Sequence, residues 1–103
     1  MFLRFYNQTE EKIDECIDKL KQNAIGLLKV EKQPLTVSVN PILPQGKHIE
    51  INLKFDTKEN ERVFYKDERN QQIYMQYCTG KKLKEYPPHL ELRKAKDLGF
   101  YHG

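Results

Sequence analysis

Apolar residues at helical spacing define the first clear element of this chain. They follow one another at intervals of three, one, three and four residues, which places them on one face of a helix: Ile13, Cys16, Ile17, Leu20 and Ala24. Charged side chains fill the opposite face. Asn7, with Glu10 three positions later, has the form of a capping box, and Gly26 is a favourable C-terminal stop. The pattern predicts a helix over residues 8–24.

Elsewhere apolar residues alternate with polar ones, which is the period of a β-strand. A short aromatic segment at residues 2–6 begins the chain, with Leu3 and Phe5 on the same side. The most regular alternation runs over residues 48–56. Further strands are predicted, the last two of them joined as a hairpin, at residues 27–32, 35–40, 62–66 and 71–78.

A short helix is predicted near the C-terminus, at residues 88–98, because Pro87 and Pro88 precede it and Gly99 follows it. Strands dominate the middle of the chain and the helices lie towards its ends, which favours an α+β class over an alternating α/β one. The length of 103 residues fits one domain, residues 1–103. We expect a curved antiparallel or mixed sheet, or a small barrel, of about five to six strands with the N-terminal helix packed on it.

Composition excludes several classes of protein. No apolar run approaches the roughly 20 residues of a membrane-spanning helix, so no membrane association is expected. The first residues lack the pattern of a signal peptide, and two cysteines cannot build a disulfide scaffold. These features predict a cytoplasmic protein with reduced thiols. The excess of lysine over arginine, 14 to 4, fits an AT-rich genome.

Candidate catalytic and metal-binding residues are sparse. His48, His89 and His102 each lack a second ligand at metal-binding spacing, so we expect neither a metal nor another cofactor. Cys16 lies in the apolar helix stripe. Cys78 lies at a strand end beside Lys81 and Lys82 and would favour thiolate if it pointed outward. Because no motif of a known enzyme is present, the protein is predicted not to be an enzyme.

Basic residues alternate with aromatic ones in the predicted hairpin. One face of the hairpin would point inward with Val63, Tyr65, Ile73, Met75 and Tyr77. The outer face would then combine two rings with two cations: Arg62, Phe64, Lys66 and Tyr74. Exposed rings on a sheet stack on bases and cations hold phosphates, so this face is a candidate nucleic-acid site. The alternative is that Phe64 is buried and the charges only solvate the edge.

The net charge of +3 is confined to the C-terminal segment, residues 80–103, which carries six basic and three acidic residues. Five of the basic residues complete the candidate site: Lys81, Lys82, Lys84, Arg93 and Lys94. Charge concentrated at one end of a protein favours contact with a polyanion, although a solvated terminal helix has the same composition.

Two functions are consistent with these patterns. The first is a small non-enzymatic regulator that binds nucleic acid, RNA in preference to duplex DNA, since only four arginines are available for base contacts in a major groove. The alternative is a protein-binding accessory or inhibitory module of a plasmid or phage in a low-GC bacterium. The same exposed aromatic residues would serve either function, and the sequence leaves the oligomeric state open.

Overall fold

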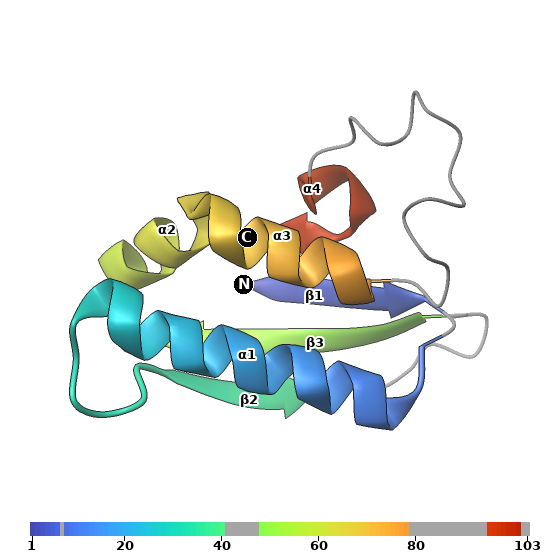
Figure 1. Ribbon diagram of the computed structural model, residues 1–103, viewed down its shortest axis with the longest axis horizontal. Coiled ribbons are helices and arrows are strands. Elements are labelled where there is room, and N and C mark those ends of the chain that lie inside the picture. Colours follow the sequence, from blue (N-terminus) through green and yellow to red (C-terminus); the bar gives the residue numbers. More distant parts are fainter. Residues whose placement is uncertain (7, 41–47, 79–94, 102–103) are drawn as a thin grey trace.

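Two β-α-β units are interleaved in one antiparallel sheet. The computed structural model describes the whole chain except residues 7, 41–47, 79–94 and 102–103 (Figure 1). Its elements, in chain order, are β1 (Phe2–Tyr6), α1 (Glu10–Leu28), β2 (Leu35–Val39), β3 (His48–Phe55), α2 (Lys58–Lys66), α3 (Glu68–Tyr77), α4 (Ala95–Leu98) and β4 (Phe100–Tyr101).

The order of the strands in the sheet is β2-β3-β1-β4, and every neighbouring pair is antiparallel. β3 therefore lies between the two strands of the β1-α1-β2 unit, and β1 lies between the two strands of the unit formed by β3, the later helices and β4. This is the split β-α-β topology of ferredoxin-like folds. The α+β class is confirmed. The described residues contain three longer strands and a two-residue fourth, so the expected sheet of five to six strands, or barrel, is wrong.

All helices that contribute to the core pack on the same face of this sheet. Leu3 and Phe5 from β1 and Ile51 and Leu53 from β3 are buried and share one cluster with the helix residues. Leu3 is paired with Ile51 across the two strands, so these side chains lie on the same face. α1 and α3 lie side by side on that face (Figure 1), and the buried cluster of the described residues lies between the helices and the sheet.

α1 confirms the predicted helix and extends beyond it. The predicted stripe, Ile13 to Ala24, is buried as expected. The N-cap is Thr9, whose Oγ1 accepts a hydrogen bond of 3.2 Å from the backbone N–H of Lys12. Gly26 lies within the helix and does not end it. The last helical residue is Leu28, and the C-cap residue Lys29 adopts a left-handed conformation with φ of 54°. Since α1 continues to Leu28, the strand predicted over residues 27–32 does not form.

The predicted hairpin is wrong, because both of its strands are helices. α2 and α3 replace the strands at residues 62–66 and 71–78. Thr57 caps α2 by accepting from the N–H of Asn60 (3.1 Å), and Asp67 caps α3 by accepting from the N–H of Asn70 (3.3 Å). These two caps begin runs rich in Glu, Arg and Gln, which have high helix propensity.

The C-terminal prediction is confirmed only in its last turn. α4 spans Ala95–Leu98, and the remainder of the predicted helix, residues 88–94, lies outside the described residues. Gly99 ends the helix with φ of 123°, and its N–H donates to the carbonyl of Ala95. Phe100 then pairs with Leu3 in the sheet, and its buried side chain joins the core.

Candidate nucleic-acid interface

The two aromatic residues of the predicted site are buried. Phe64 and Tyr74 are both 0% exposed. The Phe64 ring lies 5.0 Å from that of Phe55, and the Tyr74 ring lies 5.2 Å from that of Phe100. The prediction that these rings share an exposed face is therefore wrong. A helix directs residues four apart to the same side, so Tyr74 points into the core with Asn70 and Cys78.

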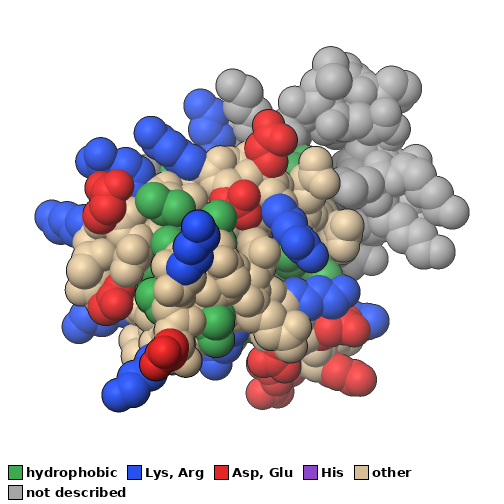
Figure 2. Space-filling model, turned by 60° about the vertical axis from the view of Figure 1, so that its left-hand side comes forward, with side chains coloured by type: hydrophobic (Ala, Val, Ile, Leu, Met, Phe, Trp, Pro, Cys, Tyr) green, Lys and Arg blue, Asp and Glu red, His purple; other side chains and the backbone are tan. Residues whose placement is uncertain are grey.

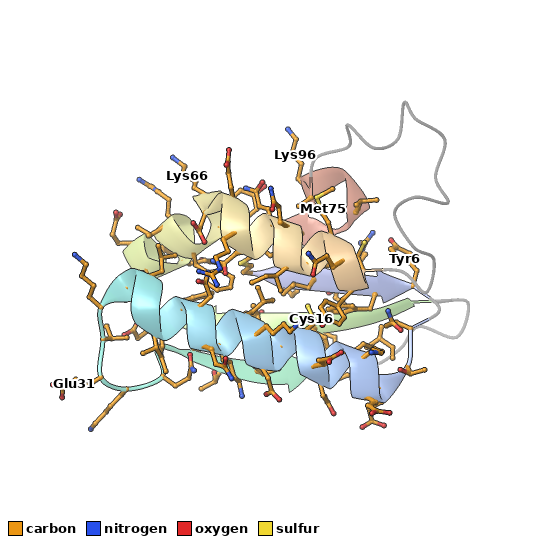
Figure 3. The ribbon with its side chains drawn as sticks, viewed as in Figure 1. Tyr6, Cys16, Glu31, Lys66, Met75 and Lys96 are labelled. Atoms are coloured by element: carbon orange, nitrogen blue, oxygen red, sulfur yellow. The ribbon has the colours of Figure 1, made fainter. Side chains whose placement is uncertain are left out.

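The basic residues of the predicted site occupy other places. Arg62 and Lys66 are exposed on α2, in the helical layer, and Lys66 extends away from the sheet (Figure 3). The other five, Lys81, Lys82, Lys84, Arg93 and Lys94, lie outside the described residues. Figure 2 shows acidic and basic side chains interspersed on the side of the molecule seen there. Among the four predicted site residues that the structure describes, no ring shares an exposed face with a cation.

Neither cysteine is placed to act as a nucleophile. Cys16 and Cys78 are both 0% exposed, so the outward orientation considered for Cys78 is wrong. Burial raises the pKa of the Cys16 thiol to about 12, and a nearby Cys78 adds to the shift. The thiol of Cys16 is therefore neutral near pH 7, and a neutral thiol is a poor nucleophile.

Tyr74 connects α3 to β1 and α4 through its hydroxyl group. Its hydroxyl lies 2.6 Å from the carbonyl oxygen of Arg4 in β1 and 2.9 Å from that of Leu98 in α4, and its single proton is shared between these two acceptors. Burial raises the pKa of this phenol, so it remains a donor at any physiological pH. The backbone of β1 is thus fixed from the core side, which positions the side chains that β1 presents on its other face.

That other face of the sheet carries no described helix and is the best candidate for a binding surface. Side chains alternate along a strand, so residues between the buried ones point away from the helices. Arg4 and Glu50 are cross-strand partners there, with Arg4 Nε 3.6 Å from Glu50 Oε2. The side chain of Asn40 donates to Glu50 Oε1 at 2.8 Å. These three residues form a polar row across β1, β3 and the end of β2.

Two aromatic residues flank this row on β1. Phe2 and Tyr6 are both partly exposed and stand on either side of Arg4, four residue steps, or about 13–14 Å of strand, apart. Phe2 is paired with Asn52, and Asn52 is paired with Ser38. Lys54, on the same side of β3, is exposed. We refer to this surface, which comprises Phe2, Arg4, Tyr6, Ser38, Glu50, Asn52 and Lys54, as the open sheet face.

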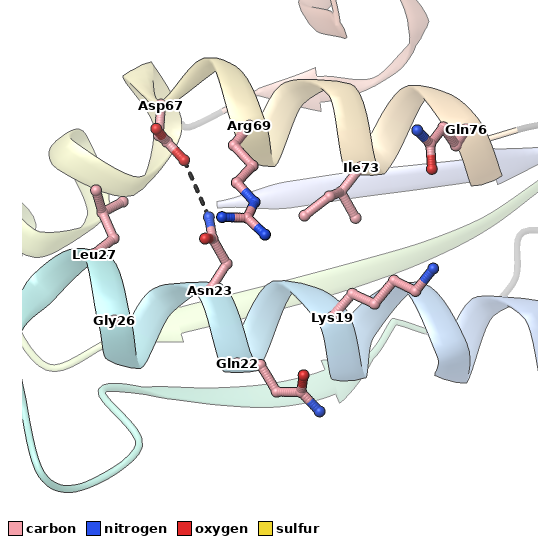
Figure 4. A pocket seen from close by; sticks show the side chains of 9 residues that line it. All are labelled: Lys19, Gln22, Asn23, Gly26, Leu27, Asp67, Arg69, Ile73 and Gln76. Atoms are coloured by element: carbon pink, nitrogen blue, oxygen red, sulfur yellow. Dashed lines mark hydrogen bonds between the residues drawn. The ribbon is translucent and has the colours of Figure 1, made fainter.

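A second concave surface lies between α1 and α3 (Figure 4). It is an open groove of about 770 Å³, and its walls mix amides, charges and a few apolar side chains: Lys19, Gln22, Asn23, Gly26, Leu27, Asp67, Arg69, Ile73 and Gln76. Asn23 donates to Asp67 (3.0 Å) and to buried Asn70 (2.6 Å). Lys19 lies over the Tyr77 ring at 5.2 Å. Several polar groups of the groove therefore serve to join the two helices.

The described residues give no other indication of a site. They contain no group of three histidine, cysteine or acidic side chains that could hold a metal ion. Within the same part of the chain, no helix is both long and apolar enough to cross a membrane.

No family model, curated protein or solved structure matches this chain. Sequence reasoning missed the open sheet face as a site, although the alternation of Phe2, Arg4 and Tyr6 with buried Leu3 and Phe5 is visible in the sequence. The missing information was the pairing of β1 with β3, which places Asn52 and Lys54 on the same surface.

Proposed function

We propose that this protein binds single-stranded nucleic acid, RNA in preference to duplex DNA, on the open sheet face and without catalysing a reaction. The observation that carries the proposal is the arrangement of β1, an inner strand on which Phe2 and Tyr6 flank Arg4. Flat sheets that bind single strands place rings under bases and cations beside phosphates.

The neighbouring strands supply the polar groups that such a ligand needs. Lys54 provides an exposed cation on β3, next to Asn52. Asn52 and Ser38 can donate to and accept from base edges and the ribose 2′-hydroxyl, which is the group that distinguishes RNA from DNA. The basic C-terminal segment, including Lys81 and Lys82, adds a sequence-based source of phosphate contacts.

The topology supports the proposal only by analogy. RNA-recognition motifs use the open face of a four-stranded sheet with helices on the other side. The described residues of this chain also form a four-stranded sheet, but the sequence lacks the aromatic signature of that family. Since one fold hosts many functions, the residues of the open sheet face carry the proposal, and the fold does not.

Fluorescence anisotropy with labelled oligonucleotides of about 12 nucleotides, as single-stranded RNA, single-stranded DNA and duplex DNA, tests the proposal directly. We expect binding at about 50 mM salt that weakens steeply as salt rises, because phosphate contacts release counterions. The duplex should bind least. If the labelled single-stranded RNA shows no binding at protein concentrations up to about 100 μM in that salt, the proposal is refuted.

Matched pairs of variants locate the binding surface. Tyr6→Ala should weaken RNA binding about 5- to 150-fold, the effect of losing one stacked ring. Tyr77→Ala removes the same type of side chain from the helical layer and should leave RNA binding unchanged. Lys54→Gln should lower the salt slope by about 0.7, and Lys66→Gln, with the same change of charge on α2, should leave it unchanged. Circular dichroism confirms that each variant is folded. Equal effects within a pair would show that the sheet face is not the site.

The alternative, a protein-binding module, predicts a different result in a pull-down. A partner that is retained after nuclease treatment, together with no affinity for the oligonucleotides, would favour protein binding. A partner lost with the nucleic acid would agree with the proposal.

A further inference from the structure

β2 is the edge strand of the sheet and offers hydrogen-bonding groups to a further strand. It stands at one end of the order β2-β3-β1-β4, and no strand among the described residues pairs with its outer side. Strand edges of this kind pair with other chains unless they are protected by charges, prolines or bulges.

The hydrogen bonds to β3 determine which groups point outward. The N–H of Asn40 donates to Glu50 O (3.0 Å), and the N–H of Asp56 donates to Pro34 O (3.0 Å). Even-numbered residues therefore bond to β3. In an antiparallel pair the alternate residues direct their backbone groups to the other side. The N–H and C=O groups of Leu35, Val37 and Val39 consequently point away from the sheet.

The sequence of β2 contains none of the usual protective residues. Its five residues, Leu-Thr-Val-Ser-Val, include no charge and no proline. Thr36, Ser38 and Val39 are exposed, and Val39 is 63% exposed, more than any other large hydrophobic side chain in the described residues. This edge is suited to pairing rather than to solvent.

We propose that β2 pairs with β2 of a second copy of this chain, antiparallel about a two-fold axis at Val37. The pattern of β2 is symmetric about that residue, with apolar positions at both ends and a hydroxyl on either side. The axis places Leu35 opposite Val39 of the other copy and Val37 opposite its own equivalent. Self-complementarity of this kind is what a two-fold interface requires.

The backbone groups agree with this register. Each of the three pairs joins residues whose N–H and C=O groups point outward, so each pair exchanges two hydrogen bonds. A register shifted by one residue would oppose outward groups to inward ones and lose them all. Thr36 also faces Ser38 of the other copy, a favourable hydroxyl pair. The two four-stranded sheets become one continuous sheet of eight strands. This inference does not rest on nucleic-acid binding.

Sedimentation equilibrium between about 1 and 500 μM protein tests the dimer, since it detects dissociation constants over that range. We expect a concentration-dependent mass approaching twice 12.3 kDa. Val39→Lys adds a charge to the edge and should weaken dimerisation at least tenfold. Val63→Lys is the matched control, because Val63 is an exposed valine on α2 and receives the same charge.

A second variant tests the backbone bonds. Val39→Pro removes an outward N–H but no bond to β3, so the monomer should remain folded by circular dichroism while the dimer weakens at least tenfold. A chain that is monomeric at every concentration would overturn the proposal. If such a monomer instead bound an unrelated extended peptide along β2, the edge would serve another partner and the proposed dimer would be wrong. A dimer that survives both Val39 variants, or one that Val63→Lys disrupts equally, would also overturn it.

Discussion

Removing the hydroxyl of Tyr74 tests how the core holds the sheet in position. Tyr74→Phe keeps the ring among Phe5 and Phe100 and deletes only the group that donates to Arg4 O at 2.6 Å and Leu98 O at 2.9 Å. The carbonyl groups lose a buried partner that water cannot easily replace. The free energy of unfolding should fall by about 1–3 kcal/mol, the cost of leaving a buried polar group without that bond.

Urea denaturation followed by circular dichroism measures this loss. With an m-value of about 1–3 kcal/mol/M, typical for a small domain, a loss of 2 kcal/mol lowers the midpoint by roughly 1 M at an unchanged m-value. Tyr77→Phe serves as the control, because Tyr77 is only partly buried, and its effect should stay below about 0.5 kcal/mol. Tyr74→Ala should cost more, about 3–5 kcal/mol, since it also leaves a cavity.

The result can contradict the reasoning in two ways. If Tyr74→Phe is as stable as the parent, the hydroxyl does not connect α3 to β1 and α4. If Tyr77→Phe destabilises the protein more than Tyr74→Phe, the ring that faces the core has been assigned to the wrong residue.

Two further predictions follow from the same region of the core. Gly99→Ala should destabilise the protein by more than about 1 kcal/mol, because the Gly99 φ of 123° disfavours any side chain. An added Cβ would also lie 2.7 Å from Arg4 Cβ and 2.8 Å from the Tyr74 hydroxyl. Thermal unfolding measures this loss, and an unchanged Tm would contradict the prediction. The buried thiol of Cys16 should lower the stability of the folded protein as the pH rises into the alkaline range. Its pKa rises from 9.0 to about 12 on folding, so the unfolded chain ionises first, and the contribution is complete below pH 9 and lost between pH 9 and 12. Between pH 8 and 10 the parent should lose about 1.4 kcal/mol more than Cys16→Ala in urea unfolding, and equal losses would refute the assignment.

Local patterns predicted the elements whose period was both long and consistent. Five apolar residues over three turns defined α1, and strict alternation defined β2 and β3. α3 was missed because Ile73, Met75 and Tyr77 alternate like a strand over a short stretch. The residues that truly face the core are Asn70 and Tyr74, and one of them is polar.

A buried asparagine cannot be recognised from its own type. Asn70 is 0% exposed because its amide donates to Phe64 O and accepts from Asn23, partners that meet it only in the folded chain. The capping residues Thr57 and Asp67 were the available signal for α2 and α3. The open sheet face was hidden for a similar reason, since it is built by pairing strands that are distant in the sequence.

The interleaving of the two β-α-β units also affects how the chain reaches its native state. The strands that pair with β1 begin at His48 and Phe100, 46 and 98 residues after Phe2. α1 depends on local contacts and can form early, whereas β1 must wait for partners that a ribosome synthesises much later. Long loops must close before those contacts form, which slows folding. During synthesis the aromatic strand β1 therefore lacks its main partner, and is liable to aggregate, until β3 has emerged as far as Phe55.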